Sequence, residues 1–148
     1  MFLENDIDYS EDADNAIGTR PPTGRHGWCT ARSGGTSLSF EYGHSGQNTP
    51  HSISQRIAEP GRIPIRLGES RGYTSDREAG LFFSGCYGDT GRLKLLTLKV
   101  SLNNPDPVKS DDAKKLLAQL VADQARYVAT ELECPTADTI PPGPPTIG

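Results

Sequence analysis

Hydrophobic and polar residues alternate along several short stretches of the chain, as is typical of half-buried β-strands. The clearest stretch is 92–102, in which Leu96, Leu98 and Val100 alternate with Thr97 and Lys99. The same period of two, or a short apolar run, recurs in four other places. The expected strands are therefore residues 28–32, 36–42, 62–67, 81–86 and 92–102.

Two further stretches have helical spacing. In residues 51–58, Ile53 and Ile57 are four positions apart and lie on one helix face. A long helix is predicted to begin at the N-cap Ser110, with acidic residues at the positive end of its dipole. We expect Leu116, Leu120 and Val121 to pack on Leu96, Leu98 and Val100, with Arg126 facing solvent. The full apolar stripe is Ala113, Leu116, Leu117, Leu120, Val121, Val128 and Leu132.

These elements predict one α+β domain over residues 20–134. It has a mostly antiparallel sheet of about five strands, in the order β-β-α-β-β-β-α, packed on the long C-terminal helix. Pro64 places its strand at a sheet edge, because proline cannot donate a ladder hydrogen bond. Residues 68–80 are expected to form an exposed loop. Residues 1–19 form an acidic arm with a short helix, and the proline-rich residues 135–148 are expected to be disordered.

The net charge of −4 is unevenly distributed along the 148 residues. The arm carries six acidic and no basic side chains, whereas residues 20–77 carry eight arginines against four acidic residues. This segment is either an ordinary solvated surface or a cationic contact surface for an anionic partner. The acidic total and the lack of interleaved basic and aromatic residues argue against nucleic acid. The candidate contact residues are Arg56, Arg62, Arg66, Arg71 and Arg77.

The three histidines, His26, His44 and His51, all fall in the first third of the chain. Together with Cys29 they could surround a metal, but no acidic partner stands at a characteristic interval. Neither a phosphate-binding loop nor a dinucleotide glycine motif is present. The sequence therefore predicts no catalytic residue, no metal and no cofactor.

The three cysteines stand at the first expected strand (Cys29), the end of the fourth (Cys86) and the end of the long helix (Cys134). The absence of a Cys-x-x-Cys motif argues against a zinc or thioredoxin-type site. A bridge between Cys86 and Cys134 would tie the helix to the sheet. Three reduced, buried thiols are the alternative.

The order of the Cys29-Thr30 strand, the apolar strand ending in Cys86 and the amphipathic helix ending in Cys134 resembles a known group of proteins. These are small extracytoplasmic domains of unknown function from Streptomyces and related actinobacteria, which usually follow a membrane helix or lipoprotein signal. The resemblance implies a membrane-anchored parent protein, an oxidising compartment and a Cys86–Cys134 disulfide. Such domains carry another upstream cysteine, so Cys29 would lack its partner here. No run of about 18 apolar residues and no signal peptide is present.

The leading hypothesis is a non-catalytic extracytoplasmic domain that binds or senses an unknown protein or anionic ligand. One alternative is a secreted hydrolase or metal-dependent enzyme that uses the region of His26, His44 and His51. Another is a structural or immunity-type partner protein. An enzyme should bring titratable groups together in a concave pocket, whereas a binding domain should expose a cationic or apolar patch.

Overall fold

The structure, a computed structural model, describes residues 8–11, 27–33, 35–44, 49–87, 93–103 and 110–148. Side chains are described from Thr30 onward, except at 33, 44, 84–87, 93, 94 and 110. The elements are β1 (Asp8–Glu11), β2 (Gly27–Ser33), β3 (Thr36–His44), α1 (Pro50–Ile57), β4 (Ile63–Leu67), β5 (Ser70–Thr74), β6 (Glu78–Tyr87), β7 (Leu93–Asn103), α2 (Ser110–Glu131), a 3-10 turn (Ala137–Thr139) and β8 (Thr146–Ile147).

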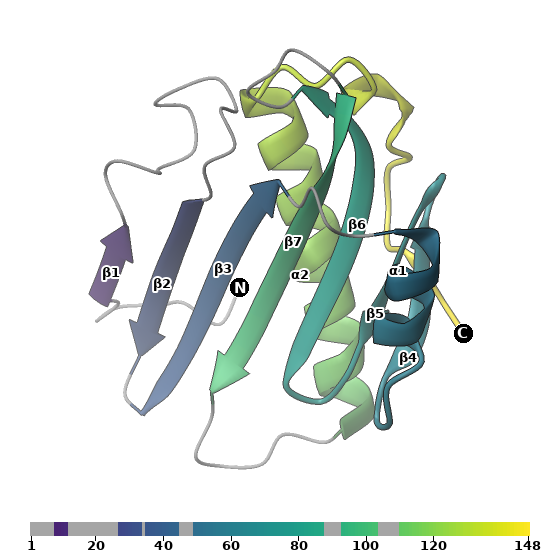
Figure 1. The fold of residues 1–148 in the computed structure, drawn as a ribbon. Helices are drawn as coiled ribbons and strands as arrows, with labels where there is room; N and C mark the ends of the chain where they lie inside the picture. Colours follow the sequence, from purple (N-terminus) through teal and green to yellow (C-terminus); the bar gives the residue numbers. More distant parts are fainter. Residues whose placement is uncertain (1–7, 12–26, 34, 45–48, 88–92, 104–109) are drawn as a thin grey trace.

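The strands form one antiparallel sheet in the order β1-β2-β3-β7-β6-β5-β4-β8 (Figure 1). The predicted α+β class and the long C-terminal helix are confirmed. The expected number of about five strands is wrong, because the sheet has eight. Short strands at both edges and β5 in the interior account for the difference.

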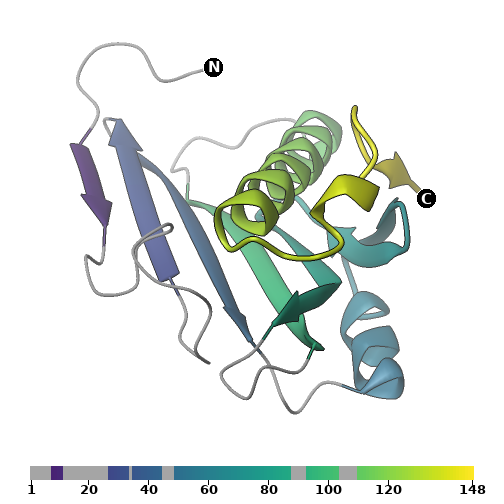
Figure 2. The ribbon, with the colours of Figure 1, turned by 90° about the horizontal axis from the view of Figure 1, so that it is seen from above.

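The main core lies between α2 and one face of the sheet (Figure 2). Leu96, Leu98 and Val100 of β7 are completely buried there, as their alternation predicts. α2 contributes Leu117 and Val121, together with alanines whose small side chains let the helix backbone approach the sheet. These alanines are Ala118, Ala122, Ala125 and Ala129.

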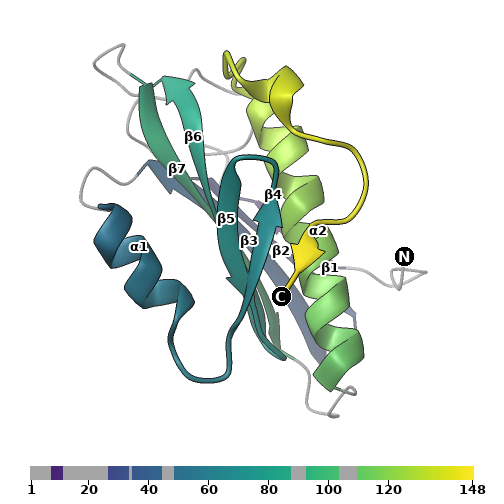
Figure 3. The same cartoon turned by 90° about the vertical axis from the view of Figure 1, so that its right-hand side faces the viewer.

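α1 lies on the opposite face of the sheet from α2, beside β5 (Figure 3). The predicted helix over residues 51–58 is confirmed, and both Ile53 and Ile57 are buried. They pack on Tyr73 and Phe82, forming a second and smaller apolar cluster. The helix covers only this end of the sheet, and it thereby forms one wall of the groove described below.

The stripe predicted for the long helix is rotated relative to the observed buried face. Leu116 is 38% exposed, so its expected packing on β7 is wrong, while Val121 is buried as expected. Leu120 packs at the margin of the core. Among the described residues, no helix is both long enough and apolar enough to cross a membrane.

The expected exposed loop over residues 68–80 is also wrong, because β5 lies between β4 and β6 and is largely buried. Its residues Gly72 and Thr74 are not apolar and gave no alternating pattern. Thr74 is buried because its hydroxyl donates a 2.7 Å hydrogen bond to the Lys114 carbonyl oxygen of α2. A tertiary contact therefore stabilises a strand that local sequence does not favour.

Two expectations about the chain's outer segments need correction. Residues 8–11 form β1 beside β2, not part of a helix, while residues 12–19 of the expected arm lie outside the described residues. Residues 135–148 are not disordered, since they form a 3-10 turn and β8. Arg126, expected on the solvent face, donates hydrogen bonds from its guanidinium to the carbonyl oxygens of Pro141 and Gly143 and so holds this segment.

Candidate functional site: a cationic groove

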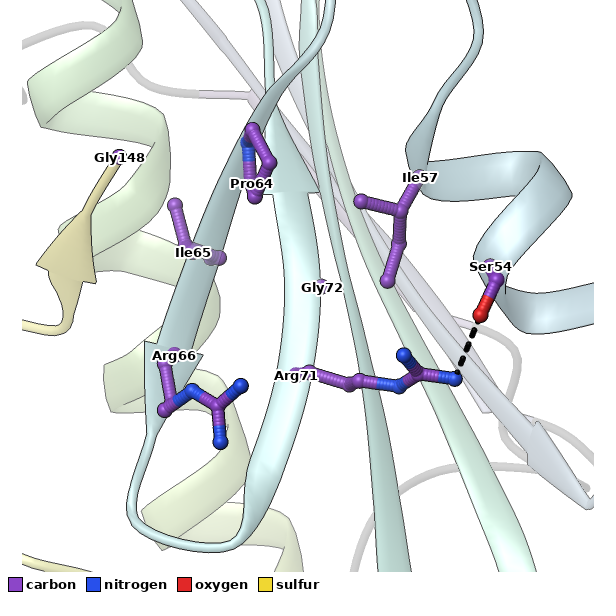
Figure 4. A pocket seen from close by; sticks show the side chains of 8 residues that line it. All are labelled: Ser54, Ile57, Pro64, Ile65, Arg66, Arg71, Gly72 and Gly148. Atoms are coloured by element: carbon purple, nitrogen blue, oxygen red, sulfur yellow. Dashed lines mark hydrogen bonds between the residues drawn. The ribbon is translucent and has the colours of Figure 1, made fainter. Parts of the chain in front are cut away.

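A groove of about 250 Å³ lies between α1 and the β4–β5 hairpin (Figure 4). One wall is the helix, the floor is the hairpin, and the far rim is the residue after β8. The groove combines an apolar floor with two arginine side chains. The lining residues are Ser54, Ile57, Pro64, Ile65, Arg66, Arg71, Gly72 and Gly148.

The helical wall is defined locally by a capping box at the start of α1. The backbone N–H of Ser52 donates to the Thr49 hydroxyl at 3.1 Å, and the Thr49 N–H donates to the Ser52 hydroxyl at 2.8 Å. Pro50 follows at the first helical position, where its missing N–H has no consequence. This cap fixes where the helix begins, and it points the Pro50 carbonyl oxygen and Ser54 hydroxyl toward β5.

Arg71 of β5 is held in place by these two groups. Its Nη2 donates to the Ser54 hydroxyl at 2.9 Å and to the Pro50 carbonyl oxygen at 3.0 Å. Both acceptors are neutral, so neither of them compensates the positive charge of the guanidinium. Figure 4 shows this side chain crossing from β5 to α1.

Arg66 of β4 stands directly opposite Arg71 in the antiparallel register. Like charges at such a position destabilise a sheet, unless something else balances them. Within the part of the chain that the structure describes, neither arginine makes an ion pair, and Arg66 is exposed. The nearest acidic residue in sequence, Glu69 of the intervening turn, is exposed and also unpaired among these residues.

Arg66 and Arg71 line one groove, and among the described residues neither has a carboxylate partner, so the groove is suited to an anion. Each planar fork can hold two oxygens of a carboxylate, sulfate or phosphate in parallel hydrogen bonds. One guanidinium is already oriented by α1, which lowers the entropy lost when an anion binds. The one hydroxyl among the lining residues, that of Ser54, donates to the Pro50 carbonyl oxygen at 3.0 Å and accepts from Arg71.

The structure separates the five candidate arginines into groups. Arg66 and Arg71 both line the groove, from opposed positions of β4 and β5. Arg56 and Arg62 instead lie over aromatic rings, with guanidinium carbons 5.0 Å from the Phe82 centroid and 3.8 Å from the Tyr73 centroid. Arg77 is exposed in the β5–β6 turn, away from the groove lining.

A second polar cluster crosses the same face of the sheet, centred on Glu78. Its carboxylate contacts Arg62 at 2.9 Å and Lys99 at 3.1 Å, while Lys99 also approaches Glu41 at 3.9 Å. Burial alone would raise the pKa of Glu78, but Lys99 and Arg62 outweigh it, and the pKa is lowered. Burial opposes the charged form of Lys99 too, yet Glu78 raises the pKa of its ammonium group. Sequence spacing gave no signal for this cluster, because these members come from three separate strands and a loop.

Tyr73 lies inside this cluster and has little access to solvent. Its hydroxyl faces Glu78 at 3.5 Å, and burial together with the Glu78 carboxylate raises its pKa. The residue is only 2% exposed. Its ring is part of the apolar cluster that packs α1 on this face of the sheet.

The structure describes the side chain of one of the three histidines. His51 is exposed in the first turn of α1, while His26 and the side chain of His44 lie outside what is described. Among the described residues, no group of three or more histidine, cysteine or acidic side chains is arranged to hold a metal ion.

Cys134 is buried and disulfide-bonded, but the side chains of Cys29 and Cys86 lie outside the described ones. Its pairing with Cys86 therefore stays a prediction. After a register shift between Ser84 and Cys86, the backbone of Cys86 lies opposite Lys94 of β7. Cys29 is on β2, three strands away from β6 and thus roughly 14 Å across the sheet.

Comparison of the chain with protein-family models, curated proteins and solved structures finds no match. The resemblance to actinobacterial extracytoplasmic domains stays a prediction, and the interpretation of function depends on the groove itself.

Proposed function

We propose that this chain is a non-catalytic binding domain that recognises an anionic group in the groove between α1 and the β4–β5 hairpin. The observation that carries this proposal is the cross-strand pair of Arg66 and Arg71, which has no acidic partner among the described residues. Such a pair costs stability in the free protein, and a bound anion would remove the repulsion.

An extracytoplasmic location, with a membrane-anchored parent protein, is part of this proposal. It is supported by the disulfide bond of Cys134, which lies three residues beyond the end of α2. Structural disulfides persist mainly in oxidising compartments. Neither alternative, an enzyme using the histidine region or an immunity-type partner, gains a specific observation from the described residues.

The test is a titration of the ¹⁵N-labelled chain with inorganic phosphate, at an ionic strength held constant with chloride. We expect resonances of α1, β4 and β5 around the groove to shift together. Arg66→Gln should weaken phosphate binding by at least about fivefold, because it removes one charge-assisted fork.

Arg77→Gln is the matched control, since it also removes one exposed arginine but lies outside the groove lining. It should leave the affinity for phosphate unchanged. Equal weakening by the two variants, or shifts scattered over the whole surface, would show that the binding is nonspecific charge attraction, and the proposal would be wrong.

A further inference from the structure

β8 adds only two residues to the edge of the sheet. Thr146 pairs with Arg66, Ile147 pairs with Ile65, and the Gly148 N–H donates to the Pro64 carbonyl oxygen at 2.8 Å. Both β8 side chains are exposed. Because β8 is short and its side chains are exposed, it contributes little packing. Another extended segment can therefore replace β8 beside β4.

The register shows which positions of that occupant face the groove. Directly opposed residues of an antiparallel pair project to the same sheet face. The Thr146 position therefore shares the face of Arg66 and Arg71, whereas the Ile147 position shares the opposite face with the buried Ile65. Gly148 lines the groove itself.

The position opposite Arg66 is consequently the place where a carboxylate would be most favourable. In this chain Thr146 occupies that position, and its neutral side chain does not compensate the positive charge of either arginine. An acidic side chain there would be the third member of a cross-strand row, next to Arg66. The position opposite Ile65, which Ile147 occupies, favours an apolar residue. The position beside Pro64, which Gly148 occupies, favours a small residue.

We infer that β4 is a strand-addition site for an extended polypeptide with the pattern acidic–apolar–small, which displaces Thr146–Gly148. This inference rests on the proposed function, and it names the ligand of the same groove. Backbone hydrogen bonds along β4 supply affinity, and the arginine pair selects the acidic residue.

The rest of the segment 135–148 keeps its place in this exchange. Pro145 is buried, and Arg126 holds the carbonyl oxygens of Pro141 and Gly143. Within the described segment, the exchange moves Thr146–Gly148 away from β4. An added peptide would begin with its acidic residue opposite Arg66 and continue past Pro64 toward Ile63.

The test uses the full chain and a fluorescent peptide, acetyl-Glu-Ile-Gly-Ser with the dye at its C-terminal end. Fluorescence anisotropy measures binding, and amide spectra of the ¹⁵N-labelled chain report on Thr146–Gly148. We expect the Glu peptide to bind while these three amides move to unpaired positions. A Lys peptide should bind at least about fivefold more weakly, because it meets two arginines.

A third peptide, with sarcosine in place of glycine, lacks the N–H that would bond to the Pro64 carbonyl oxygen, and it should also lose affinity. Arg66→Gln should reduce the preference for Glu over Lys, because only Arg71 remains, whereas Arg77→Gln should preserve it in full. No binding of the Glu peptide, equal binding of all three peptides, or binding that leaves the Thr146–Gly148 amides unchanged would overturn the inference. If phosphate still binds in an Arg66-dependent manner, only the strand-addition inference fails and the proposed function stands.

Discussion

The guanidinium group of Arg62 lies over the ring of Tyr73, 3.8 Å from guanidinium carbon to ring centroid. The same ring packs on Gly80, where an added Cβ would come within 2.6 Å of a ring carbon. Arg62 also pairs with Glu78 and, more exposed, with Glu59. Arg62, which was expected at a contact surface, is thus part of the packing beside β4, β5 and β6. Of the candidate arginines, Arg66 and Arg71 are the ones that line the groove.

The first prediction concerns acid stability at Glu78. Its folded pKa is lowered, so its stabilising contribution is complete above the usual value of 4.5 and is lost as the pH falls through the folded pKa. Urea denaturation should therefore show Glu78→Gln clearly less stable than wild type at pH 7, with the gap closing below about pH 4.5.

Glu59→Gln is the control, because its ion pair with Arg62 is more exposed and contributes little. It should stay near wild type at both pH values. A gap for Glu78→Gln that is constant from pH 7 to pH 3 would show that the carboxylate charge is not what stabilises the cluster.

The second prediction compares two neighbouring leucines of α2. Leu117 is fully buried against the sheet, while Leu116 is 38% exposed. Leu117→Ala should cost about 2–5 kcal/mol of unfolding free energy, because it leaves a cavity. Leu116→Ala should change it by no more than about 0.5 kcal/mol. Chemical denaturation of both variants decides the question, and equal losses would place the buried face of α2 elsewhere.

The third prediction concerns Arg126 and the segment 135–148. Arg126→Ala removes the hydrogen bonds to Pro141 and Gly143, so hydrogen exchange of the Gly148 amide should accelerate and stability should fall by about 1–2 kcal/mol. Asp123→Ala removes the exposed ion pair with Arg126 and a hydrogen bond from Gln119, but no contact to Pro141 or Gly143, and should leave the exchange unchanged. Unaltered exchange in Arg126→Ala would mean that β8 is held by its strand pairing alone.

The fourth prediction is the disulfide between Cys86 and Cys134. Peptide mapping without reduction should recover the two residues linked, with Cys29 as a free thiol within this chain. Closing this loop stabilises by roughly 4 kcal/mol in the chain-entropy model, so reduction should lower the unfolding free energy by up to that amount. A linkage that includes Cys29 would disprove the assignment.

Part of this fold could be predicted because its signal is local. The alternation of Leu96, Leu98 and Val100 and the four-residue spacing of Ile53 and Ile57 reflect the periods of a strand and a helix. Each pattern lies within one element and needs no knowledge of its neighbours. The class of the fold and the long C-terminal helix follow from these patterns.

The remainder was decided by tertiary structure. β5 is a strand because Thr74 bonds to α2 and Tyr73 packs between Gly80 and Arg62, and none of these partners is adjacent in sequence. The groove likewise depends on the β4–β5 register, which sets Arg66 opposite Arg71, and on the cap that orients α1. Composition marked the arginines as candidates, but charge alone does not tell a guanidinium that packs on a ring from one that faces an open groove. That difference depends on which strands are neighbours, and strand order is a long-range property that local periodicity does not encode.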